Sequence, residues 1–174
     1  MNLTKESIAV RIVLCLLLAT VSPALFAANT GTITLTGSEP VILQITVTSA
    51  PAASVLALNT LVTNLVVGTV TELSNKRAGY TVTLGSANAL AGASATPTLI
   101  SPQTTDFLAY TIQYGGVAVV FPAGGAPAVV SSVSAKTSAT GTVNSVTISF
   151  DGTSKFLNES AAYTDTLTFT IISK

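Results

Sequence analysis

The chain has 174 residues, a formal net charge of +0 and a charged fraction of only 8 %. It contains no histidine, which excludes a Ser-His-Asp or Cys-His nucleophile, an imidazole proton shuttle and a His-ligated metal. Its seven Lys and Arg residues cannot form a basic surface that neutralises several phosphates, so nucleic acid is not an expected partner. The composition therefore predicts a non-enzymatic protein without cofactor or metal, whose partners are other proteins.

Residues 1–27 have the three parts of a secretory signal peptide. Two basic residues precede the apolar run 12–19, and small residues surround Ala27. The run is shorter than the roughly 20 residues that span a bilayer, so we expect no integral membrane segment in the mature chain. Cleavage after Ala27 or one residue later would remove Cys15, the only cysteine, and leave no possibility of a disulfide.

The segment 28–40 is rich in threonine and has the alternation of a strand. Its apolar and small residues share one side of an extended chain and are Gly31, Ile33, Leu35 and Gly37. Pro40 separates this segment from the next apolar run, because proline cannot donate a ladder hydrogen bond. The segment is either the first strand of a closed sheet or an extension that pairs with another copy of the protein.

In the remainder, 41–174, apolar residues recur at every second position, the period that is typical of half-buried strands. In its first run the apolar residues on one face are Val41, Leu43, Ile45 and Val47. The same alternation, carried by β-branched and aromatic residues, predicts strands at 65–73, 80–84, 107–114, 117–121, 143–150 and 163–172. Gly115 and Gly116 predict a two-residue hairpin turn, because glycine readily adopts the positive φ angles of such turns.

No stretch has the periodicity of a helix. The alanine-rich segment 86–95 is the nearest candidate, but Gly92 and the lack of an amphipathic stripe favour a loop. Short strands separated by turns predict an all-β fold, an immunoglobulin-like antiparallel β-sandwich. We expect one domain over 41–174 with about six core strands, where a complete sandwich of this type has about seven.

The last predicted strand and the segments before it resemble those of a known family. Residues 163–171, with Lys174 shortly after them, resemble the C-terminal strand of chaperone–usher pilus subunits of the spore-coat-U-like and capsular-antigen-like branches. The runs 74–84 and 110–116 are similar to the central strands of these subunits, and the threonine-rich segment lies where their donor strand lies. The resemblance covers most of the mature chain.

The resemblance implies a sandwich that lacks its final strand, with an apolar groove between the first and last strands of the chain. In such subunits a periplasmic chaperone fills the groove with its own strand. An outer-membrane usher then exchanges that strand for the N-terminal extension of the next subunit, and a fibre grows. The chain is accordingly expected to end without a later strand that could fill the gap.

By position, the resemblance places the donor strand at 30–38, with Ile33 and Leu35 pointing inwards and Gly31 and Gly37 where side chains cannot fit. The opposite register, with the threonines inwards, stays open because the alternation permits it. The residues expected to wall the acceptor groove come from the first and last strands and are Val41, Leu43, Ile45, Val47, Leu167, Phe169 and Ile171.

We therefore expect a structural subunit of a bacterial surface pilus or capsule-like fibre that serves adhesion or biofilm formation. It would be exported through the periplasm to the cell surface and would polymerise with identical subunits. The alternative is a monomeric exported sandwich that binds a carbohydrate or a host surface through loops such as 87–103 or 122–127. Deletion of 29–38 distinguishes these functions, because only a fibre subunit would lose assembly.

Overall fold

The computed structural model of the chain describes residues 30–103, 105–159 and 162–174. The predicted signal peptide, residues 1–27, lies outside the described residues. The chain divides into two units, Met1–Ser38 and Glu39–Lys174. The boundary lies two residues before Pro40, the predicted end of the N-terminal extension.

In the first unit the described residues are 30–38, and they form neither helix nor strand. All of them are exposed to solvent, including the large apolar side chains of Ile33 and Leu35. The alternating pattern of this segment is thus not expressed as a strand in a single copy of the chain. A strand by itself is not stable in water, because its backbone groups have no ladder partner.

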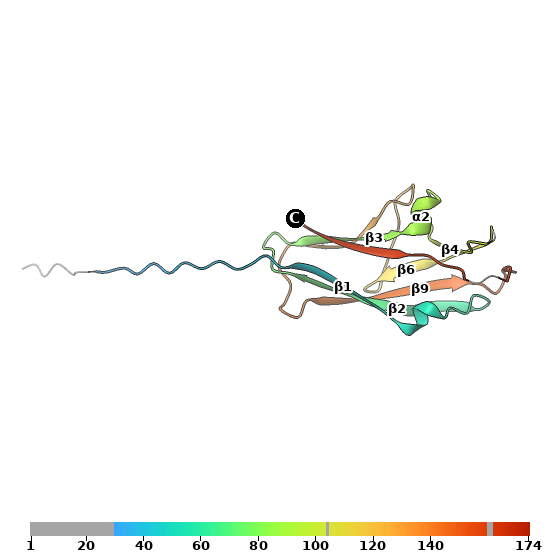
Figure 1. Cartoon of the computed structure of the whole chain (residues 1–174), viewed down its shortest axis with the longest axis horizontal. Helices are drawn as coiled ribbons and strands as arrows, with labels where there is room; N and C mark the ends of the chain where they lie inside the picture. The colour runs from blue at the N-terminus through green and yellow to red at the C-terminus, as the bar shows by residue number, and fades with distance from the viewer. Residues whose placement is uncertain (1–29, 104, 160–161) are drawn as a thin grey trace, which may run out of the picture. The chain divides into compact units, whose positions relative to one another are not determined.

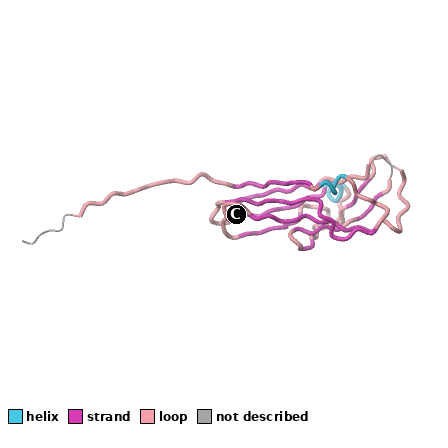
Figure 2. The backbone as a smooth tube through the Cα atoms, turned by 90° about the horizontal axis from the view of Figure 1, so that it is seen from below, coloured by secondary structure: helices cyan, strands magenta, loops and turns pink. Residues whose placement is uncertain are grey.

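The second unit is a sandwich of two antiparallel sheets, and the strands of both sheets lie along the long axis of this unit (Figures 1 and 2). The first sheet has the order β1-β2-β9-β6-β7 and consists of β1 (Leu43–Ser49), β2 (Leu61–Ser74), β9 (Thr142–Asp151), β6 (Thr111–Tyr114) and β7 (Val117–Ala118). The facing sheet has the order β10-β3-β8 and consists of β10 (Leu167–Ser173), β3 (Tyr80–Ser86) and β8 (Ala128–Val133). The prediction of an all-β antiparallel sandwich is confirmed.

Two short strands and two short helices complete the second unit. The strands β4 (Thr98–Ile100) and β5 (Phe107–Ala109) form a separate two-stranded sheet. A short 3-10 helix, η1 (Pro51–Ser54), follows β1, and a short α-helix, α2 (Ala87–Ala91), follows β3.

The core lies between the two main sheets and follows from the alternation along their strands. In β3, Tyr80, Val82 and Leu84 are fully buried, whereas the two threonines between them are half-buried. The first sheet contributes buried residues of the same kind from β2, β6 and β9, including Val70, Ile112, Tyr114, Val146, Ile148 and Phe150. Each strand therefore presents its apolar face to the opposite sheet, as its sequence period predicts.

The predicted hairpin is confirmed. Gly115 and Gly116 connect β6 to β7 with φ angles of 57° and 83°, and Tyr114 and Val117 pair across the turn. The strand predicted at 117–121 is shorter than expected, however, because the ladder of β7 ends at Ala118.

The single strand predicted at 107–114 is wrong. The strand is interrupted at Tyr110, whose backbone N–H donates to the carbonyl of Pro97 at 3.1 Å. Before this residue β5 pairs with β4, and after it β6 pairs with β9 in the main sheet. The uninterrupted apolar alternation continues through the break, so the pattern could not show that the chain changes sheets there.

The loop predicted at 86–95 is also wrong in part, because α2 occupies its first half. The Ser86 side chain caps this helix by accepting a hydrogen bond from the Ala89 N–H at 3.1 Å. Serine is a preferred N-cap residue, so the signal was present in the sequence. The strands β4 and β8 were not predicted, and β8 (Ala128–Val133) lacks a clear period of two in its burial.

A buried carboxylate links the two sheets. Glu72 of β2 is 1 % exposed and accepts hydrogen bonds from Tyr80 Oη at 2.7 Å and from Tyr114 Oη. Ser131 Oγ and Asn144 Nδ2 also donate to it, each at 3.1 Å. These donors come from both sheets, and together they occupy both carboxylate oxygens. A carboxylate is tolerated in the core because donors replace its water.

Phenol titration should report the integrity of this core. Burial, and then the hydrogen bond to Glu72, raises the pKa of Tyr80 to about 12. The same causes raise the pKa of Tyr114, and burial with the bond to Asp165 raises that of Tyr110. Folding thus favours the neutral phenols, whose stabilisation is complete below the unfolded pKa of about 10 and is lost as the pH rises towards 12.

We expect the phenolate absorbance of these tyrosines to appear only as the β-sheet circular dichroism is lost in alkali. The matched reference is the chain unfolded in denaturant, in which the same tyrosines should titrate near pH 10. Ionisation of Tyr80, Tyr110 and Tyr114 near pH 10 with the circular dichroism unchanged would contradict the buried positions described above.

Candidate functional site

The sandwich is open along one side, where the edge strands of its two sheets lie next to each other. β1 is the edge of the first sheet and β10 the edge of the second, and the two strands are in contact. Figure 1 shows them side by side, with β10 ending at the end of the sandwich where β1 begins. Within the described residues β1 pairs only with β2, and β10 only with β3. Each strand therefore has a backbone edge available to a further strand.

A groove of about 280 Å³ lies between these two edges. Val47 of β1 forms one wall, and Leu167 and Phe169 of β10 form the other. Its floor includes Val146 and Ile148, which belong to the buried core of the domain. The groove thus leads from a gap between two strand edges directly to the apolar interior. Its volume is just below the range of about 300–1,000 Å³ that is usual for pockets holding drug-sized ligands.

The structure brings together only some of the predicted groove residues. Val47, Leu167 and Phe169 line the groove. Leu43 and Ile45 of β1 and Ile171 of β10 lie on the same strands and are half-buried, but they do not line the groove itself. Ile45 instead packs against the buried core.

Val41 also does not line this groove. The residue precedes β1 and is 65 % exposed. The Asn75 side chain holds the chain on both sides of it, since Nδ2 donates to the Pro40 carbonyl at 2.6 Å and Oδ1 accepts from the Ile42 N–H at 2.8 Å. This clamp fixes the start of the sandwich to the turn after β2, so the ladder of β1 begins only at Leu43.

Analysis of the sequence missed the floor of the groove. Val67 of β2 and Val146 and Ile148 of β9 come from strands distant in sequence from β1 and β10. Leu99 of β4 also lines the groove, and β4 itself was not predicted. The alternation in β2 and β9 marks these side chains as inward-facing, but it does not say which gap they face.

Asp165 adds a carboxylate to the groove, whose other lining residues are apolar or uncharged. Its carboxylate accepts hydrogen bonds at 2.6 Å from both Tyr110 Oη and Ser86 Oγ. The N–H groups of Asn88 and Thr166 also donate to it, at 3.1 and 2.7 Å. These bonds attach the residues before β10 to β3 and α2. The carboxylate therefore holds the start of β10 in place beside the groove.

The segment predicted as the donor strand exposes its apolar side chains to solvent, whereas the groove leads to the buried core. Ile33 and Leu35 are each 90 % exposed, and the space around Gly31 and Gly37 is open. Exposure of large apolar side chains is unfavourable by about 25 cal/mol for each Å² of apolar surface, so their burial in any apolar groove would be favourable.

The loops 87–103 and 122–127, which the alternative function would use for binding, are packed against each other. Gly125, in the loop 122–127, lies so close to α2 that a Cβ there would be 2.0 Å from the Ala89 carbonyl oxygen. Its φ of 72° is also one that favours glycine. The two loops therefore form one compact corner of the sandwich.

Asp151 is the last residue of β9, and Asp106 and Asp165 lie just outside strands. In the part of the chain that the structure describes, no three His, Cys, Asp or Glu residues form a group that could hold a metal ion. Among the described residues, no helix has both the length and the apolar character needed to cross a membrane. Comparison with protein-family models finds no match, and comparison with the sequences of curated proteins finds none either.

Proposed function

We propose that this protein is the structural subunit of a surface fibre, in which residues 30–38 of one copy insert as a strand into the groove between β1 and β10 of the next. The observation that supports this most directly is the combination of an open apolar groove with an exposed, alternating apolar segment in the same chain. Insertion of an extended segment beside a free sheet edge is a common mode of peptide recognition.

The segment matches the groove in chemistry and is long enough to pair along β10. A strand lying in the groove would find ladder partners on the free backbone edges, and every second side chain would point to the apolar floor. β10 has seven residues, which span roughly 23 Å at about 3.3 Å per residue. The segment 30–38 is long enough to cover that edge completely, and it has no charged residue that insertion would bury.

The rest of the proposal rests on the resemblance to chaperone–usher pilus subunits. An exposed apolar groove would promote aggregation before assembly. As in those subunits, a periplasmic chaperone would cover the groove during export, and an outer-membrane usher would exchange the chaperone for the next subunit. The domain would then be an immunoglobulin-like sandwich completed by its neighbour. The fibre would act in adhesion or biofilm formation at the cell surface, without catalysis and without a cofactor.

The proposal is tested by moving the segment within the chain. We would compare the mature chain, the chain lacking 29–38, and the shortened chain with 29–38 attached after Lys174 by a flexible linker. The shortened chain is expected to aggregate or to melt at the lowest temperature, and the re-attached chain to be a stable monomer, because its groove is filled from within. Sizing and thermal unfolding measure both properties.

A matched control is the re-attached chain with Ile33→Asp and Leu35→Asp, which has the same length and linker. It should behave like the shortened chain, because two carboxylates cannot enter an apolar groove without a large desolvation cost. If the shortened chain is instead a monomer that melts as high as the re-attached one, the sandwich is closed by itself and the fibre proposal is wrong.

A further inference from the structure

The charges of the sandwich are sorted to its two ends. One end, called here the basic end, carries four basic residues and one acidic residue among those outside the core: Lys76, Arg77, Lys136, Lys174 and Glu39. The opposite end, called the acidic end, carries three acidic residues and one basic residue, namely Asp106, Asp151, Glu159 and Lys155, while Asp165 lies in the groove with its carboxylate hydrogen-bonded. The eleventh charged residue described, Glu72, is buried in the core.

Backbone hydrogen bonds place the residues of the basic end. Lys76 and Arg77 occupy the turn between β2 and β3. The Lys174 N–H donates to the carbonyl of Gly79 in the same turn at 3.2 Å. The loop that carries Lys136 joins them, because the Thr137 N–H donates to the Ser74 carbonyl at 2.9 Å.

The register of the strands places the acidic end at the other extreme of the sandwich. Asp151 pairs with Leu61, the first residue of β2, whereas the basic turn follows the last residue of that strand. Asp106 accepts a hydrogen bond from the Asn158 N–H at 2.8 Å, which brings Glu159 close to it. The length of β2 separates the two ends by roughly 40 Å at about 3.3 Å per residue. The Debye length is about 8 Å at physiological salt, so the ends do not neutralise each other.

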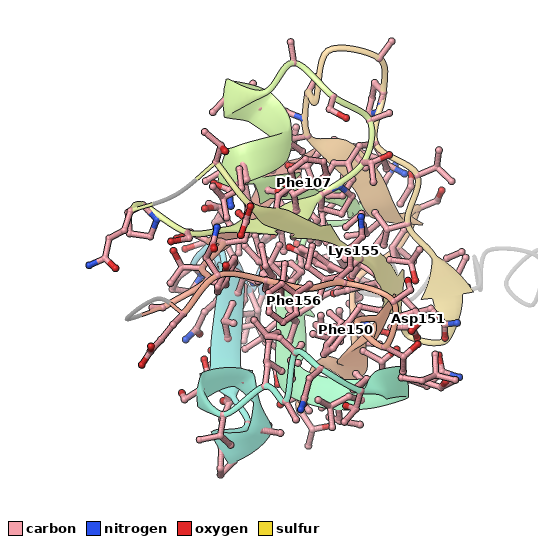
Figure 3. The ribbon with its side chains drawn as sticks, turned by 90° about the vertical axis from the view of Figure 1, so that its right-hand side faces the viewer. Phe107, Phe150, Asp151, Lys155 and Phe156 are labelled. Carbon is pink, nitrogen blue, oxygen red and sulfur yellow. The ribbon has the colours of Figure 1, made fainter. Side chains whose placement is uncertain are left out.

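Exposed aromatic residues lie among the charges of the acidic end. Figure 3 views this end directly and shows Phe107, Asp151, Lys155 and Phe156 on it. Phe156 is fully exposed and Phe107 is 52 % exposed. Lys155 Nζ lies 5.8 Å from the centre of the Phe107 ring. Exposed aromatic side chains rimmed by charges are typical of the anchors of protein interfaces.

We infer that the acidic end of one copy docks on the basic end of a second copy, with Phe156 and Phe107 as its apolar anchors. The second copy is the expected occupant because the two ends have opposite charge and belong to the same chain. Such a head-to-tail contact uses two different surfaces, so it repeats without closing and generates a filament. Complementary charges of this kind mainly raise the rate and specificity of association.

This inference rests on the proposed function and adds a second contact to it. The extension joins the sandwich at Pro40, whose carbonyl Asn75 holds beside the basic turn. A copy that donates its extension therefore brings its basic end towards the acceptor. Of the two ends that the acceptor offers, the basic one repels this surface and the acidic one attracts it. The charges thus select which end of the acceptor the donor copy approaches.

The test uses the mature chain and reverses charges at the basic end and at the acidic end of the sandwich. The first variant carries Arg77→Glu and Lys136→Glu, the second carries Asp151→Lys and Glu159→Lys, and the third combines all four. Fibre growth is followed by light scattering at low and high salt. A labelled peptide of residues 29–38, which has no sandwich attached, probes the groove separately in every variant.

Either single-end reversal should slow fibre growth at low salt by about tenfold or more, the usual size of electrostatic steering. The combined variant should recover part of the rate, because its ends again carry opposite net charges, of which the one at the former basic end is smaller than in the wild type. Peptide uptake should be unchanged throughout. In the wild type, high salt should slow growth, since it screens the attraction.

Phe156→Ala tests the apolar anchor without changing a charge. Its control is Val129→Ala, because Val129 is 63 % exposed and pairs with Thr83 in the middle of β3, away from both ends. Only the first change should slow growth. If the reversals and Phe156→Ala leave growth unchanged while the peptide is taken up, the end-to-end contact is wrong and the proposed function stands. If the wild type takes up no peptide and forms no fibre, the proposed function itself fails, and the inference with it.

Discussion

Fibres of chains that carry Ile33→Ala are expected to dissociate far more readily than wild-type fibres. Ile33 is 90 % exposed in the single chain, so its apolar surface would become buried only on insertion. Truncation of a buried isoleucine to alanine costs about 2–5 kcal/mol. This corresponds to a loss of roughly 30-fold to several thousand-fold in the equilibrium for insertion. The denaturant concentration at which fibres release subunits measures the effect.

Thr34→Ala is the matched control, because adjacent residues of a strand point to opposite faces. If Ile33 points inwards, Thr34 lies on the outer face, and its change should alter stability by less than about 0.5 kcal/mol. A larger loss for Thr34→Ala than for Ile33→Ala would establish the opposite register, which the alternation of the segment leaves open. No loss for either variant would contradict insertion of this segment.

Glu72→Ala is expected to be the most damaging single change within the sandwich. It would leave four donors from both sheets without their acceptor, including the hydroxyls of Tyr80 and Tyr114. Each unsatisfied buried polar group costs about 1–3 kcal/mol, and the lost side chain also leaves a cavity. We expect a total loss of about 3–5 kcal/mol, partly relieved by entering water. Against a typical total stability of about 5–15 kcal/mol, this would bring the domain close to unfolding.

Urea unfolding of the re-attached chain measures this loss, because its groove is filled from within and the chain is therefore expected to be a monomer. Tyr114→Phe removes one donor and leaves the carboxylate in place, so it should cost about 1–3 kcal/mol and still fold if Glu72→Ala does not. Glu159→Ala is the surface control and should change stability by less than about 0.5 kcal/mol. If Glu72→Ala were as mild as Glu159→Ala, the buried network would not stabilise the fold.

Much of the secondary structure could be predicted from the alternation of apolar residues. β3 shows why, since its three buried apolar residues fall at every second position between threonines. The same pattern could not show that 107–114 is divided between two sheets at Tyr110, because both halves bury alternate residues. It missed β8 as well, because two adjacent valines, Val129 and Val130, interrupt the period there.

The candidate groove was predictable only at its walls. Val47, Leu167 and Phe169 could be named because the resemblance to pilus subunits points to the first and last strands. The floor could not be named, because Val146 and Ile148 reach the groove through the pairing of β9 with β2, a contact between distant parts of the chain. The buried position of Glu72 was missed for a similar reason, since its donors come from several strands.

The fold class, the hairpin at Gly115 and Gly116, and an uncharged alternating segment ahead of Pro40 could be inferred from residue order alone, because they depend on local preferences and on a period of two. Which edges remain open and which charges lie together depends on how the strands pair in the fold. Each strand reverses the direction of the chain, so residues as distant in sequence as Lys76 and Lys174 gather at one end. Local patterns carry no information on such pairing, and the groove and the charged ends depend on it.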